Sequence, residues 1–571
     1  MTNWTPRTTA SPTPGDRRAR VVLARVAYSG VALAAFALTA PRVAPAQGAS
    51  ARTSFVIASG GEATVPVPTL MEGPHASVEN SDVADQLFAR LGQLGPTLIT
   101  SGDRAFEPLL ARSWTRRDSV TLAFDLDPRA TWHDGVPVTA ADVVFTFERA
   151  RNPAVTPGLA SLLRRIASVT AEGERRVVFR YTEPYAEQLY DAVFHVAPLP
   201  AHLLASIPAD SLENAPFVQA PVGSGPYRWV RRVPGEFVEL AANDRFFLGA
   251  PAVRRLIFRT AANGNARLNM LLAGEADATE NIPTPRSNID RVAADKNLRI
   301  IPVPSPTLGF LLFNQRNPQN LDQPHPILRD RDVRRAVGLA LDRRLMVKAV
   351  LGNAGEVPYG PASTILWIRH GTPAPAPIDL REARRLLDGR GWSDHDGDGV
   401  RDRAGRPLAL TMIVPTTSPI RLQMALMVQE QLRTLGVRLE IDQMEYPVYT
   451  ERRHAGAFDI DFASTSQDPS PSGLTQGWSC QGRTNFAGYC DPAVDSLIDA
   501  AIRTREGAGP AWHTVLRRIE DDSPAVFMYV LSYMYAVNRR FTNVRIRPES
   551  AWLGLREWTV SPQGARRPAG Y

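Results

Sequence analysis

Short stretches with the pattern of β-strands alternate along this chain with stretches that have the spacing of amphipathic helices, and this alternation restricts the fold more than any other feature. The predicted strands cover 119–125, 175–181, 237–241, 255–259, 309–313 and 408–414. The predicted helices cover 140–150, 333–350, 380–388, 422–435 and 492–503. With 571 residues the chain is long enough for about two to four domains. The pattern has no internal repeat and predicts an α/β architecture with more than one sheet.

The first 46 residues have the three parts of a secretory signal peptide. Residues 17–25 are rich in arginine, residues 26–40 are mostly apolar, and Ala44-Pro45-Ala46 has the small residues of a cleavage site. A membrane anchor is the alternative, but this apolar stretch falls short of the roughly 20 residues needed to cross a bilayer. We therefore expect 1–46 to be removed and the protein to be periplasmic or in the cell envelope. No cysteine stands near the cleavage site, so a lipoprotein is not indicated.

The same segment explains most of the positive charge. The whole chain has a formal net charge of +7, and the segment before residue 47 holds six arginines and one acid. Without that segment about +2 remains, and no basic run is left that could follow a phosphate backbone. The sequence therefore excludes a nucleic-acid partner.

The chain contains two cysteines, Cys480 and Cys490. In an exported protein a pair at such short spacing predicts a disulfide, and two thiols alone do not complete a structural metal site. We expect this bridge to fix one loop.

One motif has the spacing of a calcium loop. Asp394, Asp396, Asp398 and Asp402 occupy loop positions 1, 3, 5 and 9, with a glycine at position 6. Position 12 is Gly405 and not glutamate, which predicts weak Ca²⁺ binding at best. The alternative is a plain turn in which the aspartates bond their own backbone. No other cofactor is expected.

Enzyme signatures are absent from the sequence. Gly223-Ser224-Gly225-Pro226 is not a nucleophile elbow, because the proline disfavours a strand-to-helix turn at the serine. The nine histidines are scattered and never paired at metal-ligand spacing. The sequence therefore predicts a protein that is not an enzyme.

Several blocks, in order along about 450 residues, resemble the family 5 extracellular solute-binding proteins, which are the dipeptide-, oligopeptide- and nickel-binding components of ABC importers. The blocks are Glu107 to Trp114, Trp132 to Phe145, Pro221 to Tyr227, Asn243 to Pro251, Leu272 to Asp277, Phe310 to Asn314, Val333 to Arg343 and Asp379 to Asp402. Locally, Asp134-Gly135 predicts a tight turn, and Thr139 and Asp142 are suited to the start of a helix.

This resemblance implies a two-lobed periplasmic-binding-protein fold, of class II and the large peptide-binding type, with an extra subdomain in the first lobe. The implied divisions are a signal peptide at 1–46, lobe I at 47–82, 218–305 and 540–571, an extra subdomain at 83–217, and lobe II at 306–539. Such a protein captures peptides between two hinged lobes and delivers them to the permease subunits of an ABC transporter, as a monomer. A binder of another solute (a nickel chelate, haem, an oligosaccharide or an opine) and an exported hydrolase are the alternatives.

The region around Asp468-Pro469 and the two cysteines is most similar to the dipeptide-binding branch, which carries a disulfide at this spacing. That branch implies ligand contacts from Thr465, Ser466 and Asp468. Its anchor for the peptide α-amine is an aspartate where this chain has Thr465, so either Asp468 is the substitute or the ligand lacks a free α-amine. Capping of the turn at Pro469 is the alternative role of Asp468. An aromatic-walled cleft is expected to draw on Trp367, Trp478, Tyr533 and Tyr535, for each of which core packing is the alternative.

Overall fold

The computed structural model describes residues 53–283, 285 and 287–561. The predicted signal peptide, 1–46, lies outside the described residues. Within them no helix is both long and apolar enough to span a membrane. Strands and helices interleave from one end of this range to the other, so the predicted α/β class is confirmed.

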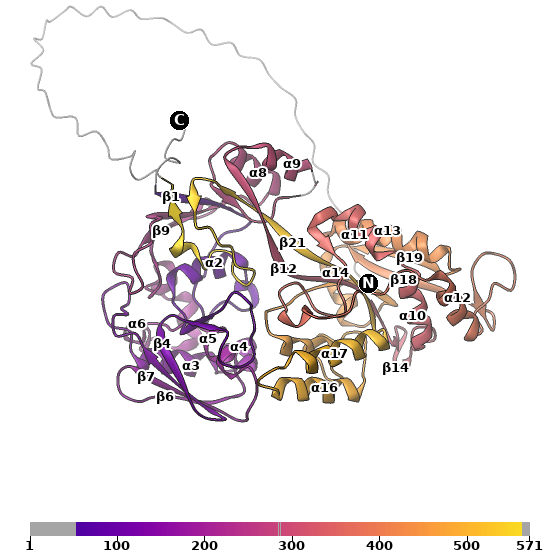
Figure 1. The fold of residues 1–571 in the computed structure, drawn as a ribbon, viewed down its shortest axis with the longest axis horizontal. Coiled ribbons are helices and arrows are strands. Elements are labelled where there is room, and N and C mark those ends of the chain that lie inside the picture. Colours follow the sequence, from indigo (N-terminus) through magenta and orange to yellow (C-terminus); the bar gives the residue numbers. More distant parts are fainter. Residues whose placement is uncertain (1–52, 284, 286, 562–571) are drawn as a thin grey trace, which may run out of the picture. The chain divides into compact units, whose positions relative to one another are not determined.

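One large sheet is the main sheet of the molecule. Its strands follow the order β19-β18-β20-β12-β21-β11-β1-β10-β9-β8, and β15 pairs with β21. Its strands are β1 Ser54–Ser59, β8 Tyr227–Val233, β9 Phe237–Ala242, β10 Arg255–Thr260, β11 Ala278–Thr279, β12 Leu298–Phe313, β15 Gly355–Glu356, β18 Ala409–Pro415, β19 Arg438–Met444, β20 Ile460–Ser466 and β21 Ala525–Asn538. Figure 1 shows the two longest, β12 and β21, running side by side from one half of the sheet to the other. They connect the lobes, and the pairing register shifts between Pro304 and Leu308, beside the predicted lobe boundary.

The segment 83–217 has a sheet of its own. β4 Ala111–Asp118, β5 Thr121–Leu126, β7 Arg176–Tyr181 and β6 Ile166–Ala171 follow one another in that order. α3 Ala140–Ala150 packs on it through a buried stripe that includes Val143 and Phe147. The Asp142 carboxylate accepts hydrogen bonds from the backbone N–H and the hydroxyl of Thr139, at 2.7 and 3.0 Å, and so fixes the start of the helix.

A close backbone approach holds this segment against the remainder of lobe I. Gly223 lies so near Leu87 that a Cβ on the glycine would stand 1.8 Å from the Leu87 carbonyl oxygen. His133 fastens the same turn, because its Nδ1 accepts from the Gly223 N–H and its Nε2 lies 3.1 Å from the Gly225 carbonyl. Burial lowers the pKa of His133 to about 4, as suits a neutral ring in a structural role. The turn is thus part of the scaffold.

The segment 306–539, which is the predicted lobe II, is built around the other half of the large sheet. α13 Pro419–Arg433 packs on β18 and β19, with α10 Arg331–Leu339, α11 Arg343–Val350 and α12 Leu380–Gly389 around a second buried core. The remaining long helices are α14 Tyr446–His454, α16 Pro492–Arg503 and α17 Gly509–Asp522, the last two of which lie side by side (Figure 1).

The predicted strands and helices agree with the structure except at 333–350. That stretch was expected to be one helix, and it is two, because the chain turns at Ala340 and starts again at Arg343. The Asp342 side chain accepts from the Leu345 N–H at 2.9 Å and caps the second helix. The prediction of a single helix was wrong. It was made because the apolar spacing continues through the turn between the two helices.

Candidate functional site

A cavity of about 460 Å³ lies between segment 83–217 and lobe II. One wall is formed by α5 Gln188–Val193 and its flanking residues, and the other by the end of β20 and by the turn that follows it, η5 Pro471–Leu474 and α15 Thr475–Trp478. Phe310 and Leu312 of β12 also line it. The cavity is therefore enclosed by parts of the chain that the sequence assigns to different lobes.

Four of the predicted ligand-binding residues line this cavity: Thr465, Ser466, Asp468 and Trp478. Thr465 and Ser466 end β20, where the strand leaves its pairing with β12. Trp478 is only 5% exposed, and its ring packs against Phe310 and Phe527. It therefore lines the cavity and also belongs to the buried core.

The other three predicted aromatic residues do not belong to the described cavity lining. Trp367 donates from Nε1 to the Thr100 hydroxyl at 3.3 Å. The hydroxyls of Tyr533 and Thr307 are 3.2 Å apart, and the Tyr535 ring packs edge-on against Trp552 in lobe I. These placements fit the packing role that was the alternative for each residue.

Asp468 occupies the position expected of a turn cap and also faces the cavity. Its Oδ1 accepts from the Ser470 N–H at 3.0 Å. Its side chain is held in the wall beside His195, and the loss of hydration there raises the pKa of this carboxyl, which the nearby histidine partly offsets. The capping bond is therefore present, and the role of Asp468 as a ligand anchor stays a prediction.

The sequence analysis missed Glu187, which is the most heavily bonded acid of the cavity. This buried carboxylate accepts hydrogen bonds from the hydroxyls of Thr100, Ser470 and Ser472. Burial raises the pKa of Glu187 to about 7, although the three hydroxyl donors oppose the shift. We refer to Thr100, Glu187, Ser470 and Ser472 as the interlobe clasp, because the serines come from lobe II and the other two residues from segment 83–217.

Further contacts join the same two parts of the chain. The Ala186 N–H donates to the Ile502 carbonyl at 2.9 Å, and the Arg505 guanidinium lies 3.4 Å from the Asp103 carboxylate. Ile502 itself lines the cavity. The closed arrangement of the walls is thus supported by backbone, hydroxyl and charged contacts.

The arginines at the cavity are engaged elsewhere or exposed. Arg453 pairs with the buried Asp461 at 2.8 Å, and Arg165 pairs with Glu183 at 3.3 Å. Arg164 is exposed at the rim. The acids Glu187, Asp191 and Asp468 and the histidine His195 line the same cavity.

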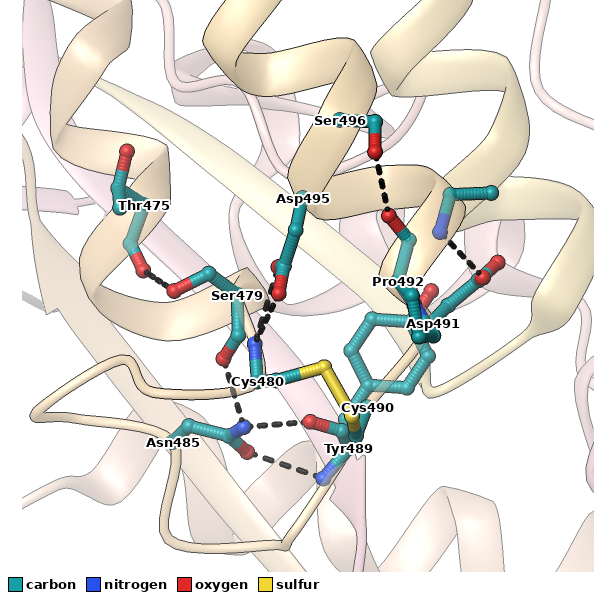
Figure 2. Close-up of a disulfide and its surroundings, with 11 residues drawn as sticks. Thr475, Ser479, Cys480, Asn485, Tyr489, Cys490, Asp491, Pro492, Asp495 and Ser496 are labelled. Atoms are coloured by element: carbon teal, nitrogen blue, oxygen red, sulfur yellow. Dashed lines mark hydrogen bonds between the residues drawn. A yellow bond between two sulfur atoms is a disulfide. The ribbon is translucent and has the colours of Figure 1, made fainter.

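The predicted disulfide between Cys480 and Cys490 is present and fixes part of the cavity wall. Thr484 and Phe486, inside the bridged loop, both line the cavity. Figure 2 shows how Asn485 spans this loop, donating to the carbonyls of Ser479 and Tyr489 at 3.0 and 2.6 Å. The Cys480 N–H donates to Asp495 of α16, which ties the bridge to the helix (Figure 2).

The loop 394–402, which we call the aspartate loop, lies away from the cavity. It has features both of a calcium loop and of a plain turn, the two alternatives that the sequence allowed. Carboxylate oxygens of Asp394, Asp396 and Asp398 lie within 4.8 Å of one another. Each also accepts from a backbone N–H of the loop itself, as a plain turn would. The fourth candidate ligand, Asp402, instead accepts from His395 at 3.0 Å. Calcium binding stays a prediction.

The sequence matches a family model described as bacterial extracellular solute-binding proteins, family 5 middle, over residues 105–486. It is 26% identical over 458 residues to the oligopeptide-binding protein AppA of Bacillus subtilis, covering 77% of this chain and 81% of AppA. It is 30% identical over 398 residues to a putative ABC transporter peptide-binding protein of Brucella ovis, covering 67% of this chain and 71% of the relative.

Solved structures share the fold. AppA of Bacillus subtilis in complex with a nonapeptide superposes with a TM-score of 0.70 at 24% identity, over 89% of this chain and 99% of that one. NikZ from Campylobacter jejuni in complex with Ni(L-His) gives a TM-score of 0.71 at 23% identity, over the same shares. At such identities the likeness shows the fold alone, and it confirms the predicted two-lobed architecture.

Proposed function

Because this chain belongs to the bacterial extracellular solute-binding proteins of family 5, we propose that it captures peptides between its two lobes and delivers them to the permease of an ABC transporter. The observation that carries this proposal is the cavity of about 460 Å³ with walls from both lobes. Its size lies within the usual range for pockets that enclose small ligands. A ligand held there contacts both lobes at once, so binding and closure of the lobes are linked.

The names of the relatives favour a peptide over the other solutes as the ligand of this chain. The Bacillus and Brucella proteins carry peptide-binding names and cover most of this chain, whereas the nickel-binding NikZ is similar in fold. The cavity wall also offers backbone groups, hydroxyls and carboxylates, which are the partners that a peptide main chain and its termini require. A nickel chelate is the second candidate.

We also propose that the protein binds its ligand without catalysing a reaction, works outside the cytoplasm and acts as a monomer. Ser470 and Ser472 both donate their hydroxyls to Glu187. Within the described residues, no cavity-lining serine or cysteine is hydrogen bonded to a histidine, the arrangement that activates a nucleophile. The predicted signal peptide supports the extracytoplasmic location.

Native mass spectrometry of protein exported by its host tests the proposal. We expect the folded protein to carry a mixture of peptides, which mild denaturation releases. A single metal-bearing adduct would favour the nickel chelate instead. Turnover of added peptides to shorter products would contradict a pure binding role.

A further inference from the structure

The lobes also meet outside the cavity, at the turn between α16 and α17. The Arg505 guanidinium of this turn lies 3.4 Å from the Asp103 carboxylate, and the guanidinium of Arg503, the last residue of α16, lies 3.9 Å from the Glu183 carboxylate. Both acids belong to segment 83–217, and both arginines belong to lobe II. Within the described residues, the lining of the cavity includes none of these four side chains.

Each of the two acids is also held by an arginine of its own segment. Arg116 donates from Nε and Nη2 to the two carboxylate oxygens of Asp103, both at 2.7 Å. Arg165 lies 3.3 Å from Glu183. An acid that is already fixed loses little further conformational freedom when it meets a second partner. The ion pairs between the lobes are therefore more favourable than pairs between two mobile side chains.

The backbone of the two lobes comes close at the same place. Gly102 has a φ of +75°, and a Cβ on it would stand 3.2 Å from the Arg505 carbonyl oxygen. The Ala186 N–H donates to the Ile502 carbonyl at 2.9 Å, and the Ala186 carbonyl accepts from the Gly102 N–H at 2.8 Å. The ion pairs thus flank a direct backbone contact between segment 83–217 and the end of α16.

These contacts connect to both walls of the cavity. Arg116 donates from Nη1 to the Gln188 side chain, at the start of α5, and Ile502 lines the cavity from α16. The turn around Gly223 fastens segment 83–217 to the remainder of lobe I. Opening of the lobes must therefore separate the ion pairs as well as the two walls.

We infer that Asp103, Glu183, Arg503 and Arg505 form an outer latch that keeps the walls closed and so sets how long a bound solute stays, an inference that rests on the proposed function. Contacts made only in the closed form shift the equilibrium toward that form. A solute enclosed by both walls leaves only after they part, so the latch acts on the rate of dissociation. Since Arg505 is 34% exposed and Arg503 is 67% exposed, salt should weaken the latch.

Hydrogen–deuterium exchange of the ligand-free protein tests the latch by itself. The group to follow is the Ala186 N–H, because its bond to Ile502 joins the two lobes and must open before exchange. We expect exchange roughly 5-fold faster in Arg505→Gln and roughly 2-fold faster in Arg503→Gln. Arg104→Gln is the matched control, since Arg104 also faces lobe II, 3.7 Å from Glu506, but is 91% exposed. It should exchange at the wild-type rate.

Release of bound peptide tests the consequence for function. The protein is loaded with a deuterated tripeptide library and chased with an excess of the unlabelled library, and native mass spectrometry follows the loss of the bound label. We expect release roughly 5-fold faster from Arg505→Gln than from wild type, with association no slower. Added salt should speed release from the wild type more than from this variant.

The outcomes separate this inference from the proposed function. Wild-type exchange at Ala186 in both latch variants would overturn the latch, and so would faster exchange with an unchanged rate of peptide release. An equal effect of Arg104→Gln would also overturn it. If Arg505→Gln does not fold, the exposed Arg503→Gln carries the comparison. If the wild type binds no tripeptide, peptide capture is contradicted, and exchange at Ala186 decides by itself whether the latch holds the lobes.

Discussion

Glu187 shows how a single residue can link pH to the closed arrangement of the lobes. Its carboxylate lies in the interlobe clasp, surrounded by hydroxyl donors and without a cation among them. Its pKa is raised to about 7, so the folded protein binds this proton more tightly than the unfolded chain does. The stabilisation is complete below the unfolded pKa of about 4.5 and is lost as the pH rises through 7.

We therefore expect the free energy of unfolding of the wild type to fall, relative to Glu187→Gln, between about pH 4.5 and pH 7. The relative change should be about 3 kcal/mol at most. Chemical denaturation at several pH values measures it. Glu506→Gln is the control, because that side chain is 77% exposed. An equal pH dependence for Glu187→Gln and wild type would mean that folding does not raise the pKa of Glu187.

A glycine is required at position 223 because of a close contact with the Leu87 carbonyl group, and not because of its backbone angles. A methyl group at this position would overlap the Leu87 carbonyl oxygen, which already accepts from the Gly225 N–H at 2.7 Å. We expect Gly223→Ala to lower the free energy of unfolding by about 3 kcal/mol or more, measured by denaturant titration. Gly389→Ala, which has no neighbour within 4 Å, should cause no loss. Similar stability for both variants would contradict this view of the turn.

At the residue scale the sequence located one wall of the cavity better than the other. Thr465, Ser466 and Asp468 could be predicted because they flank the Asp-Pro motif of the resemblance. Glu187 and Ser470 are 283 residues apart, and only the completed fold brings them together. Glu187 and Asp191 within the stretch 185–194 were a local signal, but nothing in the sequence indicates a partner in the predicted lobe II.

Among the elements, the bridged loop between Cys480 and Cys490 supports the cavity wall. A loop of this length should contribute about 2–3 kcal/mol through the reduced entropy of the unfolded chain. We expect the variant with both cysteines changed to serine to lose that amount in chemical denaturation. Reductant should lower the stability of the wild type and leave the double variant unaffected. No loss in the double variant would mean that the hydrogen bonds of Asn485 hold the loop by themselves.

The aspartate loop offers a second test at this scale. Three carboxylates lie close together, but each is already bonded to the loop backbone, and position 12 has no acid. We expect calcium to bind with a dissociation constant in the millimolar range, measured by calorimetry. Asp396→Asn should weaken it further. Micromolar affinity would contradict this expectation, and no binding at 10-fold higher calcium would leave a plain turn.

Helices and strands were predicted well where a cap or a turn residue ends the pattern. Asp379 caps α12 by accepting from the Glu382 N–H, and this residue is visible in the sequence. The break between α10 and α11 was missed, although Asp342 is an equally good cap, because apolar spacing on both sides outweighed one polar residue. Local polar signals deserve more weight than continuity of a hydrophobic stripe.

For the whole molecule, the sheet order could not be derived from periodicity. β1 lies between β10 and β11, far from it in sequence, and β12 and β21 pair across more than two hundred residues. Hydrophobic pattern gives the strands but not their partners, since any buried strand can pair with any other. The resemblance to a family supplied the two-lobed arrangement, and the exact lobe boundaries stay predictions.

The central claim is that a peptide is enclosed between the two walls of the cavity. Hydrogen–deuterium exchange with and without a saturating tripeptide library of free N-termini tests it most directly. We predict slower exchange in 186–195 and in 465–478 together, because the ligand contacts both walls and holds them closed. Protection of only one wall, or protection confined to a region outside the cavity such as 394–402, would contradict the claim.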